Sequence, residues 1–522
     1  MRDEIAGVTR RTKILAILVT FVLVGAIAVA AVVGGGGGDD KASGTKDPAP
    51  ASDGVPSGLE DFYSQKLSWD DCGQTARCTS VEVPIDYAKP DRDTLKLAVK
   101  VIPAKGDGGR SLFVNPGGPG GEAQGFADYM KAQLASKVLD RYDIVGVDPR
   151  GVGKSKPVDC LSDRSLDAYA ASEPDPDDPA EITEYRKTVV AFGQGCERRS
   201  GALAAHISTE EAARDFDIVR ALLGAKTFDW FGASYGTQLG ATYATLFPKT
   251  VGRMVLDGAS DPSLSKEESA FGQTTGFQRA LDAYIKDCVR QNSCPLGRDA
   301  DAAKDKLAAF VEARDSSPLG TVETRKATEG ITFYGIAVTL YDKKTWPVLT
   351  QALTSAFKGD GSILLRLSDA YFRRSPNGSY KENLHEANPA INCLDAGDED
   401  LSTLQDVENS LARFSRVSAV FGRTMAWGAI GCTDWPIKGD HPQVAVDATG
   451  SKPIVVLGTT RDPATPYEWA KSLTKQLKTA VLVTRQGDGH TAYTSGNRCI
   501  KRLVDAYLVD GTVPKDGTTC KE

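Results

Sequence analysis

The sequence lacks the motifs that mark common metal and phosphate sites. Its 522 residues contain neither an H-E-x-x-H segment nor a paired C-x-x-C, so nothing in the chain supports a metal site. The segment Gly153-Lys154-Ser155 resembles the end of a phosphate-binding loop, but the glycine that such a loop requires earlier would fall at Asp148. We therefore expect an activity that uses no metal and no other cofactor.

The chain also lacks a strong excess of one charge, a basic stripe and an internal repeat. It has 62 lysine and arginine residues against 69 aspartate and glutamate residues, a formal net charge of -7. This excludes a nucleic-acid partner, because such partners require clustered positive charge. Charged residues at 25% and hydrophobic residues at 41% are typical of a soluble globular protein. The length indicates one large domain with an insertion, or two domains.

Long hydrophobic runs are missing too, with one exception near the N-terminus. Residues 14–33 are apolar and uncharged, follow three basic residues at 10–13, and precede a run of glycines. About 20 apolar residues span a bilayer, so residues 1–33 are expected to be a signal anchor or a long signal peptide with a cleavage site at 28–30. No cysteine follows directly, which excludes a lipoprotein anchor. We favour the anchor, because the run exceeds a usual signal core, and the positive flank then leaves the remaining chain outside.

Two further features fit an exported protein. Residues 34–58, rich in glycine, serine, proline and charged side chains, cannot form a core and are expected to be a flexible linker. Ten cysteines in an exported chain indicate five disulfides, although sequence alone does not determine their connectivity. Short loops and the remaining order favour the pairs Cys72–Cys78, Cys160–Cys196, Cys288–Cys294, Cys393–Cys432 and Cys499–Cys520.

The most informative segment that is present is D-W-F-G-A-S-Y-G-T-Q-L-G at residues 229–240. It contains a G-x-S-x-G nucleophile elbow, in which Ser234 follows an apolar strand and precedes a helical pattern (237–246) that Pro248 ends. Small residues must flank the serine, because a strand that turns at once into a helix strains the backbone and crowds its neighbours. The turn exposes the Ser234 hydroxyl and leaves the Tyr235 N–H free to face a developing oxyanion.

A glycine-rich loop follows an early strand, where the second half of an oxyanion hole would lie. Residues 111–114 are apolar and continue into N-P-G-G-P-G-G at 115–121. Because glycine lets a backbone approach a ligand closely, we expect Gly117 or Gly118 to supply the second N–H donor.

Histidine is scarce, with four in the whole chain, so the search for a general base is short. In chains with this elbow the order is serine, acid, histidine. His206 lies before the serine, and His385 and His441 lie in polar, irregular surroundings. His490 follows an expected strand (479–484) on a glycine-rich loop, and open parallel sheets place their sites at such strand ends. His490 is therefore the candidate base.

The acid should lie between Ser234 and His490, on a loop that follows a strand. Residues 453–457 form an expected strand, and G-T-T-R-D-P-A-T-P follows it. We choose Asp462, whose alternative role is that of a turn residue before proline. Asp488 is the rival, but so near a neighbour of His490 would hardly reach the far side of the imidazole.

Strand and helix patterns alternate along most of the chain, which indicates an α/β protein. A long stretch of helical character, including 275–291 and 301–314, separates the last two expected strands from the others. We expect residues 262–445 to form an α-helical cap that excludes water from the serine and selects substrates. The expected strands are 95–102, 111–114, 144–147, 227–231, 254–256, 453–457 and 480–484.

From about residue 60 to the C-terminus, the chain resembles the tripeptidyl aminopeptidases and their actinobacterial cell-envelope relatives, a branch of the prolyl iminopeptidase-like α/β-hydrolases. The matching motifs are W-D-D-C (69–72), V-P-I-D-Y-A-K-P (83–90), N-P-G-G-P-G-G (115–121), Y-D-I-V-G-V-D-P-R-G-V-G-K-S (142–155), G-A-S-Y-G-T (232–237), V-L-D-G (255–258), I-N-C-L-D (391–395), C-T-D-W-P (432–436), R-D-P-A-T-P (461–466) and G-D-G-H (487–490). The resemblance implies an α/β-hydrolase fold with a mostly parallel sheet. The cap would separate an N-terminal core part (59–261) from a C-terminal one (446–522).

In relatives of this kind the matching serine, aspartate and histidine form the triad, which implies catalytic roles for Ser234, Asp462 and His490. One departure is Glu122, because the family loop usually continues with small residues after P-G-G. An enzyme that binds a free N-terminus must offset the burial of an ammonium group, so it needs carboxylates in the cap or cleft. Glu122 and Asp395 are the candidates.

The resemblance favours an aminopeptidase that releases short peptides, of the tripeptidyl type, from free N-termini through an acyl-enzyme. The N-terminal segment indicates an extracytoplasmic enzyme, membrane-anchored or secreted. Its expected partners are peptide substrates, and a monomer is expected. Fold and triad do not choose between amides and esters. A carboxylesterase or lipase acting on envelope esters is therefore the alternative, and a non-catalytic surface binding module is the second.

Overall fold

The computed structural model describes residues 55–73, 75–106, 109–396, 403–438 and 444–522. The expected signal segment (1–33), most of the expected linker (34–58) and His441 lie outside these residues. Within the described ranges, no helix is both long and apolar enough to cross a membrane.

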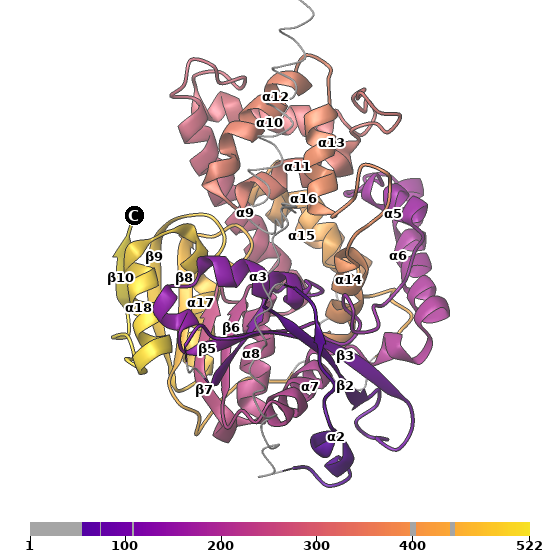
Figure 1. Cartoon of the computed structure of the whole chain (residues 1–522). Coiled ribbons are helices and arrows are strands. Elements are labelled where there is room, and N and C mark those ends of the chain that lie inside the picture. Colours follow the sequence, from indigo (N-terminus) through magenta and orange to yellow (C-terminus); the bar gives the residue numbers. More distant parts are fainter. Residues whose placement is uncertain (1–54, 74, 107–108, 397–402, 439–443) are drawn as a thin grey trace, which may run out of the picture.

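One sheet organises the molecule, with helices above, below and at its sides (Figure 1). Its strands lie in the order β1-β2-β3-β5-β4-β6-β7-β8-β9-β10, antiparallel from β1 to β5 and parallel from β5 to β10. This confirms the expected α/β-hydrolase fold with a mostly parallel sheet. The strands are β1 (Asp70–Asp71), β2 (Arg77–Pro84), β3 (Thr94–Ile102), β4 (Arg110–Asn115), β5 (Tyr142–Val147), β6 (Phe228–Ala233), β7 (Val251–Asp257), β8 (Ile454–Arg461), β9 (Ala480–Asp488) and β10 (Thr518–Lys521).

All seven expected strands are present, and the differences lie at the edges of the sheet. Strand β2 alternates buried and exposed side chains, and β10 is short and polar, so neither shows the continuous apolar run of a central strand. Strand β9 continues to Asp488, through residues expected to form a loop. Pairing with β8 explains this, because the ladder continues to Arg461 opposite Asp488.

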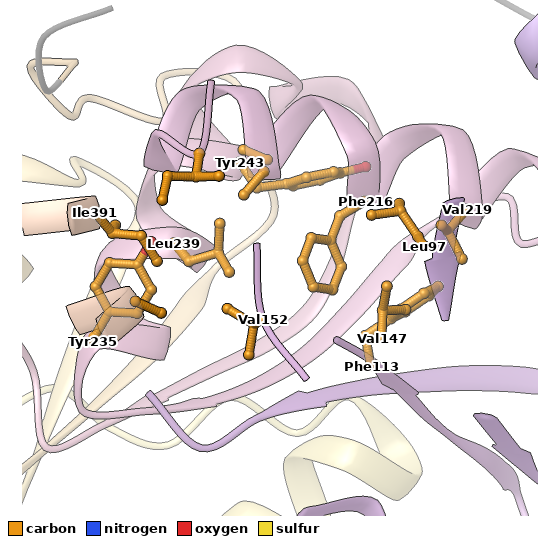
Figure 2. Close-up of a cluster of buried hydrophobic side chains, with 14 of the residues drawn as sticks. Leu97, Phe113, Val147, Val152, Phe216, Val219, Tyr235, Leu239, Tyr243 and Ile391 are labelled. Atoms are coloured by element: carbon orange, nitrogen blue, oxygen red, sulfur yellow. The ribbon is translucent and has the colours of Figure 1, made fainter. Parts of the chain in front are cut away.

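Helices cover both faces of the sheet, because successive side chains of a strand point to opposite faces. Trp230 contributes to a core cluster with Phe216 and Leu239, whereas Phe231 contributes to another with Val504. Figure 2 shows part of the first cluster. The helices on the first face are α2 (Glu60–Ser64), α7 (Thr209–Leu222), α8 (Tyr235–Leu246) and α17 (Tyr467–Gln476), and those on the second are α3 (Ala123–Gln133), α4 (Ser136–Leu139) and α18 (Arg498–Asp510).

The remaining helices form a cap from two separate segments of the chain (Figure 1). One segment lies between β5 and β6, where no cap helices were expected, and the other between β7 and β8. They pack together, since Ala170 shares a core cluster with Phe277 and Ile331, and Tyr185 lies 5.7 Å from Trp427 between ring centroids. The helices are α5 (Asp163–Ala170), α6 (Pro179–Ser200), α9 (Lys266–Cys288), α10 (Ala300–Glu312), α11 (Glu329–Leu340), α12 (Trp346–Ala356), α13 (Ser362–Tyr371), α14 (Leu384–Asp395), α15 (Leu404–Val417) and α16 (Gly422–Gly428).

All ten cysteines are paired, and the five pairs are those that loop length and order favoured. One of them, Cys393–Cys432, ties the end of α14 to the segment that leads back to the sheet. Another, Cys499–Cys520, joins α18 to β10, which pairs with β9, the strand that precedes His490.

Candidate active site

Ser234 lies on a strained turn between β6 and α8. Its backbone has φ 56° and ψ −126°, in a region that non-glycine residues rarely occupy. The turn allows no larger neighbours, because a Cβ at Gly232 would collide with the backbone of Gly236. The Ser234 N–H donates to the Asp257 carbonyl oxygen over 2.9 Å, which fixes the turn against the end of β7.

His490 and Asp462 form a closely bonded pair. The His490 Nδ1 lies 2.9 Å from each carboxylate oxygen of Asp462. The other ring nitrogen, Nε2, takes no part in this contact. Asp462 is fully buried and also accepts the backbone N–H groups of Ala464 (3.0 Å), Thr465 (2.9 Å) and Thr491 (3.2 Å). Burial lowers the pKa of His490, but the charge and hydrogen bond of Asp462 outweigh this effect, so the pKa is raised.

Asp488, the rival acid, has other partners. Its carboxylate accepts Arg461 Nη2 over 3.0 Å and lies 3.6 Å from Lys343 Nζ. The structure therefore places Asp462, rather than Asp488, against His490.

The turn after β7 brings the serine and histidine segments together. On one side, the Asp257 carbonyl oxygen binds the elbow; on the other, its carboxylate accepts the N–H groups of Ala492 (2.7 Å) and Tyr493 (2.9 Å) beyond His490. At the next residue, Gly258, a Cβ would lie 3.1 Å from His490 Cε1. Burial raises the pKa of Asp257 to about 6. Sequence reasoning gave Asp257 no role, although it lies in the V-L-D-G motif.

The cap also contacts the histidine loop, through a residue that no sequence signal identified. The Tyr341 carbonyl oxygen, directly after α11, accepts the His490 N–H over 2.8 Å. The rings of Tyr341 and His490 are perpendicular, with centroids 5.4 Å apart. The end of one cap helix therefore helps to position the imidazole.

The glycine loop after β4 lies against the elbow. Gly117 has φ 91°, and a Cβ there would lie 2.9 Å from Ser234 Cβ and from the Tyr235 nitrogen. The Gly117 N–H already donates to Asn115 Oδ1 over 2.9 Å, so Gly118 is the better placed of the two expected donors. The Tyr235 N–H lies in the first turn of α8, where helices leave N–H groups without intrahelical acceptors.

Helix α14 of the cap contacts the glycine loop and, through Thr209, also Tyr235 of the elbow. Near its start, Asn388 Nδ2 donates to the Pro119 carbonyl oxygen over 3.3 Å. At its end, Asp395 accepts the Thr209 N–H (2.8 Å) and hydroxyl (2.5 Å), and the Thr209 hydroxyl lies 2.5 Å from the Tyr235 hydroxyl. Figure 2 shows Tyr235 and Ile391 of α14 in the same buried cluster.

The two expected substrate carboxylates occupy different environments. Asp395 is 2% exposed, and burial raises its pKa to about 6 despite the two bonds from Thr209. Glu122 instead lines a cavity of about 490 Å³, together with residues that include Asn383 and Glu386. Burial, Asp148 and Glu382 raise the pKa of Glu122 to about 7. Only Glu122 of the pair therefore faces an open space.

The other described histidines lie elsewhere. His206 Nδ1 lies 2.9 Å from Glu211 Oε1, and His385 Nε2 lies 2.9 Å from the Tyr371 carbonyl oxygen. Among the described residues, one carboxylate trio in the cap has the close spacing that a cation site needs: Glu173, Asp175 and Glu329.

Two family models match the chain. The model described as alpha/beta hydrolase fold matches residues 110–318, which include the glycine loop and Ser234. The model described as TAP-like protein matches residues 418–520, which include Asp462 and His490.

Several curated proteins are similar over most of their length. The chain is 35% identical to the serine protease Hip1 of Mycobacterium tuberculosis, over 88% of this chain and 92% of that protein. It is 34% identical to carboxylesterase B of the same species, over 99% of both. It is 31% identical to the tripeptidyl aminopeptidase of Streptomyces lividans, over 87% of this chain and 86% of that protein.

Proposed function

The chain belongs to the TAP-like family of α/β-hydrolases and is a serine hydrolase, and from that premise we propose an exported aminopeptidase that releases short peptides from free N-termini. The observation that supports the proposal is the His490–Asp462 pair, together with Asp257 at the end of β7, which bonds both the strained Ser234 turn and the segment just after His490. The tripeptidyl aminopeptidase among the relatives supports the peptide substrate.

The proposed mechanism uses side chains and backbone groups alone. His490 Nε2 takes the Ser234 proton, Ser234 attacks the carbonyl carbon, and Asp462 holds the imidazole and stabilises its charged form. The Tyr235 and Gly118 N–H groups stabilise the oxyanion. The imidazolium then protonates the leaving amine, and water releases the acyl group from Ser234 by the reverse route.

Recognition of the N-terminus requires anionic groups, and Glu122 remains a candidate because it opens onto a cavity directly after the glycine loop. Asp395 suits a different role, because Thr209 occupies both of its carboxylate oxygens. We therefore assign Asp395 to positioning Tyr235, whose N–H is a proposed oxyanion donor.

The five disulfides support an extracytoplasmic location, because such bonds persist in oxidising compartments. The N-terminal anchor, the domain boundaries and the monomeric state stay predictions.

Matched substrates test this function. Wild-type protein should react with a fluorophosphonate at Ser234 and cleave H-Ala-Pro-Ala anilides roughly ten- to hundredfold faster than their N-acetylated counterparts, because acetylation removes the charge that an anionic pocket binds. Equal cleavage of free and acetylated peptides would contradict the aminopeptidase. Faster hydrolysis of p-nitrophenyl esters than of either anilide would favour the carboxylesterase, which one relative's name supports.

A further inference from the structure

Helix α9 of the cap lies directly against the loop that carries the proposed acid. Its residue Gly276 is buried, and a Cβ there would lie 2.5 Å from the Pro463 carbonyl oxygen and 2.9 Å from that of Asp462. Both distances are too short for a real Cβ, and backbone atoms cannot turn aside as a flexible side chain can. Only glycine permits this approach. A helix of the cap therefore touches the backbone of the acid itself.

One face of α9 makes this contact. Gly272, Gly276 and Arg279 recur at the spacing of helical turns, which places them on one side of the helix. A Cβ at Gly272 would lie 2.8 Å from the Trp469 ring, and Arg279 Nη1 lies 2.9 Å from Glu468 Oε2. Trp469 and Glu468 belong to α17, which follows the acid loop. Helix α9 is therefore packed along both the acid loop and the helix after it.

A side-chain hydrogen bond joins the same helix to the acid loop. Gln273 Nε2 donates to the Ala464 carbonyl oxygen over 3.0 Å. The Ala464 carbonyl and the Thr465 N–H belong to one planar peptide group. That N–H donates to Asp462 Oδ1 over 2.9 Å. Gln273 therefore bonds one end of the peptide group whose other end holds the carboxylate.

This arrangement affects Asp462 in two ways. A peptide group that is bonded at both ends has a fixed direction, so the Thr465 N–H stays aimed at the carboxylate. Hydrogen bonds in series also polarise one another, so the bond from Gln273 strengthens the donor that faces Asp462. The position of Asp462 in turn determines that of the imidazole, since His490 Nδ1 lies 2.9 Å from both of its oxygens. Small displacements of reacting groups lower rates steeply.

The residue after Gly276 reaches the histidine loop from the same helix. The Phe277 ring lies 5.8 Å from the Tyr341 ring between centroids. Tyr341 accepts the His490 N–H through its carbonyl oxygen, and its ring packs against the imidazole. The cap is thus attached to the acid loop by α9 and to the histidine loop by Tyr341. On this side it cannot lift away without breaking the contacts that hold both loops.

We propose that Gln273 and Gly276 are positioning residues for the acid Asp462, so that α9 of the cap is part of the catalytic apparatus as well as a cover. The inference rests on the proposed function, because it assumes the catalytic roles of Asp462 and His490. Both residues act through the backbone of the acid loop. Catalysis then requires that the cap be seated on that loop.

Replacing Gln273 with methionine tests the hydrogen bond. Methionine keeps the length and helix preference of glutamine but cannot donate. In Gln273→Met we expect kcat to fall about three- to tenfold with p-nitrophenyl esters and peptide anilides alike, and KM to change less than about twofold. Both substrates should respond, because the acid serves the chemistry of each.

A second glutamine of α9 provides the matched control. Gln278 Nε2 donates to Asp282 Oδ1 over 2.8 Å, so its hydrogen bond stays within the helix. Gln278→Met makes the same chemical change away from the acid loop. This variant should keep the wild-type kcat and KM.

Replacing Gly276 with alanine tests the close approach. Alanine normally stabilises a helix relative to glycine, but here the Cβ would displace the carbonyl groups of the acid loop. We expect kcat in Gly276→Ala to fall about ten- to hundredfold on both substrates. Gly428→Ala in α16 is the control, because a Cβ there meets nothing within 4 Å, and it should keep the wild-type kcat.

A double variant shows whether the effect passes through Asp462. In an Asp462→Asn background, Gln273→Met should lower kcat for the ester by no more than about twofold, because the acid that it positions is already impaired. A contact that served only stability would lower kcat by the same factor in both backgrounds. Thermal unfolding of each variant verifies that the protein is folded at the assay temperature.

Three outcomes would overturn this inference while the proposed function stands. One is a wild-type kcat in folded Gln273→Met, which decides alone if Gly276→Ala does not fold. Another is an equal loss of kcat with and without the Asp462 carboxylate. The third is a rise in KM at constant kcat, which would make α9 a substrate contact. Hydrolysis of neither anilides nor esters by the wild type would instead contradict the proposed function itself.

Discussion

Two buried acids at the sheet and Glu329 of the cap are held in different ways. At the sheet, Asp462 has four hydrogen-bonded groups around it, and Asp257 accepts two N–H groups at the end of β7. In the cap, Glu329 is nearly as buried yet has no partner among the described residues. Full pairing preorganises groups that must not move during a reaction. At Glu329, burial and the neighbouring carboxylates instead raise the pKa to about 9, so this acid is neutral near pH 7.

Removal of a proposed triad member should produce the largest loss of kcat. This change tests whether residues at the edge of the sheet perform the chemistry. We expect Ser234→Ala and His490→Ala each to lower kcat about 10⁴-fold or more, because triad members act as a unit. Peptide anilide assays measure this loss, with Glu408→Gln, at an exposed position of α15, as the control. A kcat within tenfold of the wild-type value in either variant would contradict the proposed catalytic role of that residue.

The second prediction compares the two acids near His490. Asp462→Asn should lower kcat by about 10⁴-fold, because an amide favours the wrong imidazole tautomer. Asp488→Asn should change kcat little, since its carboxylate pairs with Arg461. Steady-state kinetics of both variants checks this, and the opposite ranking would exchange their roles.

A third test asks whether the cap reaches the chemistry through α14. Thr209→Val removes the hydroxyl between Asp395 and Tyr235, so the Tyr235 N–H should be less well placed. We expect kcat to fall roughly tenfold with little change in KM, a fraction of the effect of losing an oxyanion donor. Thr354→Val is the matched control, because this threonine of cap helix α12 donates its hydroxyl to the Thr350 carbonyl oxygen, away from the proposed site. A rise in KM at constant kcat would indicate a substrate contact instead.

The smallest expected effect is a shift of the pH profile. Catalysis needs the neutral imidazole, so kcat/KM should rise with pH through a midpoint above the ordinary histidine value of about 6.5, because Asp462 raises the pKa of His490. Asp257 contributes in the same direction, so Asp257→Asn should lower the midpoint. An unchanged or higher midpoint in that variant would show that the turn after β7 does not influence the imidazole.

Much of the sheet and its candidate site was predictable, because each feature is local in sequence. The elbow around Ser234, the loop after β8 and the loop after β9 each follow an apolar strand, and strand order then places them at one edge. Strands β1, β2 and β10 lie at the two ends of the sheet and were missed, because they lack the continuous buried apolar run of central strands. The contribution of α5 and α6 to the cap was missed because their packing partners lie far along the chain.

The sequence by itself therefore determined the α/β-hydrolase fold, and it indicated the favoured cysteine pairs and the candidate catalytic residues, since backbone sterics and hydrophobic periodicity act over short spans. Only the tertiary structure decided which groups each buried acid contacts. Asp395 meets Thr209 across 186 residues, Asp257 meets the His490 loop across 235, and Glu329 meets Glu173 between two separate cap segments. Partners at such separations depend on how whole helices and strands pack, and burial then sets the cost of each charge.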